Sequence, residues 1–198
     1  AEEVERSGSA IYSWASWTDA GTAQGVLHRF MTLSNPQRAV IAAWSHGARQ
    51  DTDPFHAVEH PVDPSPELGL LEDLCFYDAY LGVVTEGTSP PTKELIYKTM
   101  GEEGWKRTSV WPLPETEYAS WYFREDGHLS TEAPSTRGGD EYRVDFTHTT
   151  GTRNRWATNN GAGDVVYPDR ADSDAKLLTY TSAPLEADLE VTGHPGGR

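Results

Sequence analysis

The amino-acid sequence predicts an α/β unit followed by a β unit, the α/β plus β class. In residues 1–86, strand-like apolar segments alternate with helical ones, whereas short apolar segments between turn residues dominate from residue 93 onward. Between the two patterns, residues 87–92 read Gly-Thr-Ser-Pro-Pro-Thr, a run of turn-forming residues. We therefore expect a domain boundary there, with residues 1–86 in the first domain and residues 87–198 in the second.

The first domain is predicted to contain strand, helix, strand, long loop and helix, in that order. Residues 10–12 are typical of a short strand, residues 23–31 carry apolar side chains at helical spacing, and residues 38–43 form an apolar run typical of a buried strand. A Pro- and Asp-rich loop follows. Ser65 and Pro66 then predict a helix start, with Ser as the cap and Pro at the first position. The apolar face of that helix is predicted at Leu70, Leu74, Tyr77 and Leu81.

The second domain is predicted to be a β-sandwich or jelly roll, because six short strand-like segments recur with turn residues between them. They are residues 94–100, 118–124, 140–144, 165–167, 176–181 and 189–192.

Composition excludes two classes of partner. The 31 acidic and 16 basic residues give a formal net charge of -15, which repels nucleic acid and anionic membrane surfaces. The sequence contains no run of 18 apolar residues and no basic start followed by an apolar block. The location of the protein stays open, with the cytoplasm favoured. Cys75 lies within an apolar helical pattern, and we expect it to be packed.

Asp19 and His46 carry the strongest chemical signal. Asp19 comes just after the first predicted strand and His46 just after the second, with a helix between them. A carboxylate can hold an imidazole in one tautomer, and the imidazole can then take a proton from a nucleophile. Taken singly, Asp19 would be read as a helix cap and His46 as a loop histidine. Their paired context favours the catalytic interpretation.

Several motifs resemble those of a known family. They are SWTDAG at residues 16–21, AWSHG at 43–47, DAYLG at 78–82, MGEEGWKR at 100–107 with WPLP at 111–114, and the segments 177–185 and 188–193. In this order they are similar to the cocaine-esterase and X-Pro dipeptidyl-peptidase hydrolases, the CocE/NonD family. Two positions depart from the family pattern: Ser16 stands where Gly is usual, and Ala42-Ala43 where Gly-Pro is usual.

The resemblance implies the C-terminal end of an α/β-hydrolase domain followed by part of a β jelly-roll sandwich. It implies Asp19 as the acid and His46 as the base of a Ser-Asp-His triad, with Trp17, Trp44 and Ser45 as supporting neighbours. The nucleophile would lie upstream of this chain, which would be an inactive interior piece of a larger serine hydrolase. The implied substrate is a small-molecule or peptide acyl compound, with no cofactor and no metal. The resemblance also allows a homo-oligomeric parent.

Two other motifs compete with this interpretation. Residues 43–47 approximate the Gly-x-Ser-x-Gly nucleophile elbow around Ser45, but a loop rich in Asp and Pro follows where an elbow requires a helix. His56, Glu59 and His60 spell the His-x-x-Glu-His pattern of a zinc peptidase. Pro54 confines any helix there to about two turns before the next proline, so we expect a solvated loop.

Two further patterns suggest binding without catalysis. A sugar-binding module would use exposed tryptophans, here Trp105, Trp111, Trp121 and Trp156, although core packing is favoured because aromatic side chains dominate core burial. The aspartates at positions 169, 172 and 174 suggest calcium, but they lack EF-hand spacing. We expect a solvated acidic turn.

Overall fold

The computed structural model of the protein describes residues 1–81, 92–158 and 164–196. The chain forms two units, Ala1–Pro114 with Thr152–Val166, and Glu115–Gly151 with Tyr167–Arg198. The predicted domain boundary at residues 86 and 87, with most of its turn-forming run, lies outside the described residues. That division stays a prediction.

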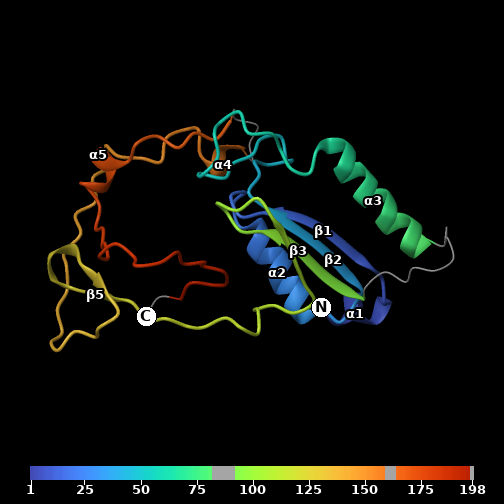
Figure 1. Cartoon of the computed structure of the whole chain (residues 1–198), viewed down its shortest axis with the longest axis horizontal. Coiled ribbons are helices and arrows are strands. Elements are labelled where there is room, and N and C mark those ends of the chain that lie inside the picture. Colours follow the sequence, from blue (N-terminus) through green and yellow to red (C-terminus); the bar gives the residue numbers. More distant parts are fainter. Residues whose placement is uncertain (82–91, 159–163, 197–198) are drawn as a thin grey trace. The chain divides into compact units, whose positions relative to one another are not determined.

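A four-stranded mixed sheet organises the first unit (Figure 1). Its strands are β1 (Ile11–Ser16), β2 (Gln37–Ala42), β3 (Lys93–Lys98) and β4 (Trp105–Thr108), in the order β1-β2-β3-β4. Strands β1, β2 and β3 run parallel, and β4 is antiparallel to β3. The predicted strand at residues 94–100 is therefore formed as β3. Instead of starting a separate β unit, it extends the sheet of β1 and β2.

Helix α2 (Thr22–Thr32) connects β1 to β2 and covers one face of the sheet. Alternate strand residues point to opposite faces, and the odd-numbered positions of β2 and β3 face α2. The resulting core contains Ala15, Ala23, Val26, Leu27, Phe30, Ala39, Ile41, Leu95, Tyr97 and Trp111. The predicted helix at residues 23–31 and the strand at 38–43 are formed within one residue of their expected limits.

Helix α3 (Pro66–Leu81) lies on the opposite face of the sheet, and it begins at Pro66 as predicted. The ring of Phe76 stacks on Tyr12 of β1 with 4.8 Å between centroids, and Glu72 pairs with Arg38 of β2. The apolar cluster of this face contains Val40, Ala42, Trp44 and Ile96.

The predicted apolar face of α3 is not buried, which corrects the sequence interpretation. Leu70, Leu74, Tyr77 and Leu81 are all exposed, and so is Cys75, which we expected to be packed. The sequence pattern locates apolar side chains correctly, but α3 is apolar around most of its circumference. It meets the sheet through Glu72 and Phe76, on a different side. Within the described ranges, no other element covers the remaining apolar surface.

The second unit contains little regular structure. Strands β5 (Tyr122–Phe123) and β6 (Leu129–Ser130) pair antiparallel around the short helix η1 (Glu125–Gly127), and His128 bridges to Thr181. The strand predicted at residues 118–124 is thus reduced to two residues. Segments 140–144, 165–167, 176–180 and 189–192 form no strand. The apolar side chains of three of these segments, such as Val144 and Val191, are exposed. Val165 differs, because it is buried and belongs to the first unit, where its N–H and carbonyl bond the side chain of Gln50.

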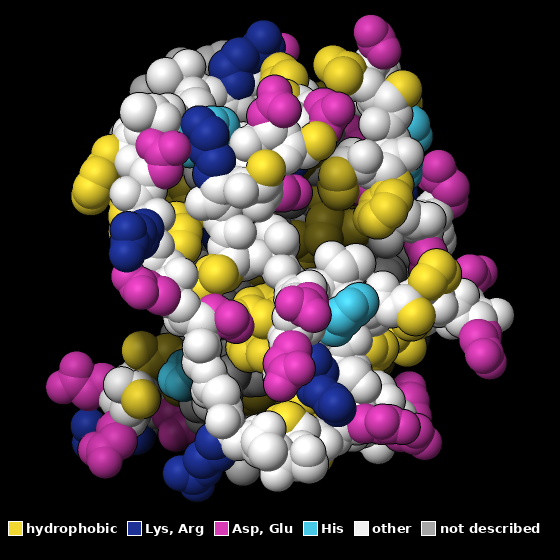
Figure 2. Space-filling model, turned by 90° about the vertical axis from the view of Figure 1, so that its left-hand side faces the viewer, with side chains coloured by type: hydrophobic (Ala, Val, Ile, Leu, Met, Phe, Trp, Pro, Cys, Tyr) yellow, Lys and Arg dark blue, Asp and Glu magenta, His cyan; other side chains and the backbone are white. Residues whose placement is uncertain are grey.

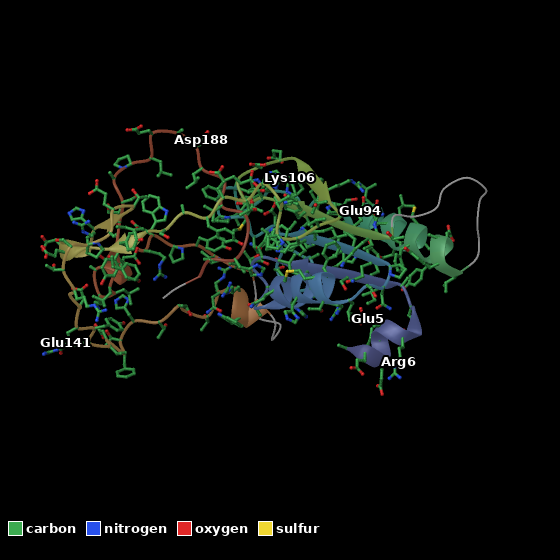
Figure 3. All side chains as sticks on the ribbon, turned by 90° about the horizontal axis from the view of Figure 1, so that it is seen from below. Glu5, Arg6, Glu94, Lys106, Glu141 and Asp188 are labelled. Carbon is green, nitrogen blue, oxygen red and sulfur yellow. The ribbon has the colours of Figure 1, made fainter. Side chains whose placement is uncertain are left out.

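The remaining helices are short: α1 (Glu2–Ser7), α4 (Arg155–Thr158) and α5 (Ala171–Asp174). Glu94 on β3, which is labelled in Figure 3, forms ion pairs with Arg38 of β2 at 3.1 Å and with Arg107 of β4 at 2.9 Å. These pairs link three adjacent strands. Acidic side chains are spread over the face seen in Figure 2, with hydrophobic side chains exposed among them. Among the described helices, none combines the length and the apolar character that a membrane span requires.

Candidate active site

The candidate acid and base follow two neighbouring parallel strands. Asp19 lies three residues after β1 ends at Ser16, and His46 lies four residues after β2 ends at Ala42. Ser16 and Ala42 are paired in the ladder, so the two following loops leave the same edge of the sheet side by side. The structure brings the predicted pair together, with 3.0 Å between His46 Nδ1 and Asp19 Oδ2.

Burial distinguishes the two partners. The side chain of Asp19 is 10% exposed, whereas that of His46 is 52% exposed. An ionised carboxylate only accepts hydrogen bonds, so the proton of this contact lies on Nδ1 and the lone pair of a neutral ring lies on Nε2. The other carboxylate oxygen, Oδ1, is buried and has no hydrogen-bond partner among the described residues. The arrangement presents a histidine with a fixed tautomer at the surface of the unit.

Both loops contain backbone in the left-handed region. Ala20 has φ 50°, directly after the acid, and Gly47 and Ala48 have φ 76° and 51°, directly after the base. For alanine this conformation is sparsely populated and costs about 1–3 kcal/mol. The Asp19 carbonyl is held by the Thr22 N–H and hydroxyl at 3.1 and 2.9 Å. Strained residues of this kind cluster at functional sites, which agrees with the position of the pair.

The Ser16 hydroxyl joins the two loops. Its Oγ accepts from the Trp44 N–H at 2.7 Å and lies 2.7 Å from the Trp44 carbonyl, to which it can donate. The Thr18 N–H also reaches it at 3.0 Å. From the sequence, Ser16 was notable only as a departure from the family pattern. The signal that could have revealed its role is a hydroxyl residue at the end of one strand, beside the end of its parallel neighbour.

We predict that Ser16→Ala lowers the free energy of unfolding by about 1–3 kcal/mol, because it leaves the buried Trp44 N–H without its acceptor. Urea unfolding checks this value. Ser13→Ala on the same strand is the matched control, since its hydroxyl only accepts an exposed hydrogen bond from Arg29. Equal unfolding midpoints for the two variants would show that Ser16 does not join the loops.

The three predicted supporting residues are held by hydrogen bonds. Trp17 Nε1 donates to the Lys98 carbonyl at 2.7 Å, and Trp44 Nε1 donates to the Asp63 carbonyl at 3.1 Å. Ser45 is buried, and its Oγ accepts from the Gln50 N–H at 3.1 Å. A turn, not a helix, follows Ser45. Its hydroxyl is therefore engaged within its own loop, and no elbow is formed there.

Comparisons with known proteins identify the family of the chain. The family model of the X-Pro dipeptidyl-peptidase C-terminal non-catalytic domain matches residues 88–196, more than half of the chain. The chain belongs to the CocE/NonD family. The matched CocE/NonD domain is of β-sandwich type.

Curated relatives extend the similarity over nearly the whole chain. Proteins named "Putative serine esterase" from Mycobacterium bovis and Mycobacterium tuberculosis are each 42% identical over 196 residues, which is 97% of this chain and 30% of theirs. The cocaine esterase of a Rhodococcus species is 26% identical over 204 residues, covering 93% of this chain and 34% of the esterase. The chain thus spans about a third of the length of these relatives. No solved structure matches.

The His-x-x-Glu-His segment of this CocE/NonD chain does not form a helix. Turns lie at residues 54–55 and 58–59, and Glu59 is exposed. His56 and His60 instead share one carboxylate, with their Nδ1 atoms 2.9 and 2.8 Å from Asp51 Oδ2. Burial raises the pKa of Asp51, but hydrogen bonds from the Asp53 N–H and from both histidines hold that pKa below its ordinary value. The helical platform of a zinc peptidase is therefore missing.

The other candidate binding residues are dispersed. Trp105 packs near Trp44 on one face of the sheet, while Trp111 packs against Tyr97 on the other. These two side chains cannot form one sugar-stacking surface, and Trp121 belongs to the second unit.

The acidic turn holds its aspartates by local contacts. Asp169 accepts from the Ala171 N–H, and Asp174 pairs with Arg170 at 3.4 Å. Within the described residues, these aspartates form no common cluster suited to a metal ion.

Proposed function

We propose that this chain is part of a serine hydrolase that cleaves acyl bonds through a Ser-Asp-His triad. The chain contributes Asp19 as the acid and His46 as the base, and the nucleophilic serine belongs to a part of the protein outside these residues. The observation that carries the proposal is the 3.0 Å contact between His46 Nδ1 and Asp19 Oδ2 at the adjoining ends of two parallel strands. The relatives named as esterases support a hydrolase.

Each group has a step in the proposed mechanism. Asp19 Oδ2 accepts a hydrogen bond from His46 Nδ1–H, which keeps the lone pair on His46 Nε2, the ring nitrogen that faces away from the carboxylate. Nε2 takes the serine proton as the serine oxygen attacks the substrate carbonyl, and Asp19 stabilises the imidazolium. His46 then returns the proton to the leaving alcohol or amine, and an acyl-enzyme remains. In the second half, Nε2 takes a proton from water as the water oxygen attacks the acyl carbonyl. The bond between the acyl group and the serine oxygen then breaks, the acid leaves, and His46 returns the proton to the serine oxygen.

The fold of the parent protein follows the same proposal. Strands β1 and β2 with α2 would be the C-terminal end of an α/β-hydrolase domain, in which the acid precedes the histidine along the chain. Residues 87–198 would be part of a jelly roll. The parallel crossover and the order of Asp19 and His46 support the first assignment. The match to a β-sandwich-type domain supports the second.

The substrate class is an acyl ester or an X-Pro amide. The esterase names of the relatives support esters, and the name of the matched domain supports X-Pro peptides. In both classes the serine attacks a carbonyl carbon, and the leaving group needs a proton. His46 supplies that proton in either case. The shape of the pocket beside the serine decides which class is preferred.

A comparison of the isolated chain with the full-length protein tests the proposal. We expect the isolated chain neither to hydrolyse p-nitrophenyl esters above the buffer rate nor to react with a fluorophosphonate probe, because it lacks an activated serine. The full-length protein should do both. Full-length Ser45→Ala is the matched control and should keep its labelling. Covalent labelling of any serine within the isolated chain would overturn the proposal.

A further inference from the structure

A second cluster of ionisable side chains lies in the loop that follows His46. Asp51, His56 and His60 are partly buried, and one potential ligand atom from each lies within 4.8 Å of the others. The two imidazoles stack with 4.0 Å between centroids and 30° between planes. The tilt between the planes does not set the direction of the ring nitrogens, which their partners determine. The hydrolytic pair uses none of these three residues.

The shared carboxylate orients both rings. His56 Nδ1 and His60 Nδ1 both lie within hydrogen-bond distance of Asp51 Oδ2, at 2.9 and 2.8 Å. The carboxylate accepts, so both neutral rings carry their proton on Nδ1 and expose a lone pair on Nε2. Histidine ligands of metals commonly donate the other ring N–H to a carboxylate in this way, which fixes the tautomer and raises ligand basicity. Asp51 accepts the Nδ1–H of both histidines and so fixes the tautomer of both rings.

A third ligand faces the two Nε2 atoms. Glu103, in the turn between β3 and β4, places Oε1 3.7 Å from His56 Nε2 and 3.8 Å from His60 Nε2. Both distances are too long for hydrogen bonds. They are close to the separation of roughly 3.3–3.5 Å between ligands around tetrahedral zinc, given metal-ligand distances of about 2.0–2.2 Å. Asp53 Oδ2, 3.9 Å from His56 Nε2, is the nearest fourth donor.

The charges around His56 also favour a cation. Asp51, Asp53 and Asp63 line a small cavity beside His56, together with Lys98. The three carboxylates outnumber the single ammonium group. Lys98 Nζ lies 2.9 Å from Asp63 Oδ2 and 3.9 Å from Glu103 Oε2, the oxygen of Glu103 that is not a proposed ligand.

The geometry points to a binding site for a divalent transition-metal ion, Zn²⁺ in first place, formed by His56 Nε2, His60 Nε2 and Glu103 Oε1 and oriented by Asp51. The imidazole and carboxylate ligands are those that zinc uses in proteins. This site uses the two histidines of the His-x-x-Glu-His segment but not Glu59. It departs from the solvated loop expected from the sequence because Asp51 and Glu103 were not recognisable as partners.

The metal would fasten the loop that carries the candidate base. Asp51 forms a β-bridge with Trp44, two residues before His46, and the Thr52 N–H donates to the Ala43 carbonyl. Glu103 belongs to the β3–β4 turn. An ion between His56, His60 and Glu103 therefore joins that loop to the far edge of the sheet. Its role is to position the loop, and it takes no part in the hydrolytic steps.

Zinc titration of the chelator-stripped chain tests the site directly. With a chromophoric chelator as competitor, we expect one Zn²⁺ per chain and a rise in the thermal midpoint, because an ion that binds only the folded state stabilises it. Glu103→Gln should weaken binding by about tenfold or more and reduce the thermal shift, and Asp51→Asn should weaken binding by about 10–100-fold. The Glu103 side chain is 76% exposed, so its amide variant should fold normally.

Two matched controls separate this site from other binding. Glu59→Gln keeps all proposed ligands, and His28→Ala removes a histidine elsewhere, so both should retain the wild-type affinity and stoichiometry. Equal affinity in wild type, Glu103→Gln and His60→Ala would mean adventitious zinc only and would overturn the inference. So would the absence of stoichiometric binding to the wild type, or a loss of binding in Glu59→Gln. None of these readouts depends on hydrolysis, so the proposed function can fail while this site stands.

Discussion

Full-length His46→Ala is expected to lose activity by about four orders of magnitude or more in kcat, with little change in substrate binding. Without the imidazole, no group at this position takes the proton from the serine or returns it to the leaving group. Steady-state kinetics with an ester substrate measure the effect. The matched control is His28→Ala, an exposed histidine on α2 that should keep the wild-type rate. A His46→Ala enzyme that kept its full kcat would remove His46 from the mechanism.

Asp19→Asn tests the other half of the pair and should cost about 10⁴-fold in kcat. An amide is nearly the same size as the carboxylate, but it can donate to Nδ1 and so favour the wrong tautomer, with the proton on Nε2. It also cannot stabilise the imidazolium. Asp19 is buried, so the replacement could also destabilise the fold. The unfolding midpoint of the variant measures that effect separately from the loss of kcat. An active, stable variant would contradict the acid role.

Phe30→Ala is expected to have the largest effect on stability. Phe30 is 1% exposed in the core between α2 and the sheet. Removing its ring should lower the free energy of unfolding of the first unit by about 3–5 kcal/mol, through lost burial and the cavity left behind. Urea unfolding followed by tryptophan fluorescence measures this loss.

The neighbouring residue supplies the control for that experiment. Met31 follows Phe30 on α2 but is 40% exposed, so Met31→Ala should cost far less. Similar losses for the two variants would mean that α2 does not pack on the sheet through Phe30. Because α2 separates the strands that carry Asp19 and His46, such a result would also weaken the geometry of the candidate site.

Local patterns in the sequence were sufficient for the parts of the fold that positioned the site. The apolar spacing of residues 23–31 and the run at 38–43 predicted α2 and β2, and Ser65 with Pro66 predicted the start of α3. The approach of Asp19 to His46 followed from two strands joined by one helix, since such strands run parallel and end at the same edge.

Interactions between distant segments were not predictable in the same way. The Ser16 hydroxyl bonds Trp44 across two strands, and Glu103 faces His56 and His60 from a turn far along the chain. Neither contact has a periodicity or a local motif. The exposure of Leu70 and Leu74 was also missed, because a helical pattern locates apolar residues but does not show whether another surface covers them. In the second unit, strand propensity at residues 140–144 was not enough without a pairing partner.

Mapping the site of fluorophosphonate labelling in the full-length protein tests the central claim most directly. Mass spectrometry of the labelled peptides should place the modified serine outside residues 1–198, and labelling should be strongly slowed in His46→Ala and in Asp19→Asn. That result would show that Asp19 and His46 serve a nucleophile supplied by another part of the protein. A label on Ser45 or any other serine of this chain, or labelling at an unchanged rate in both variants, would contradict the account.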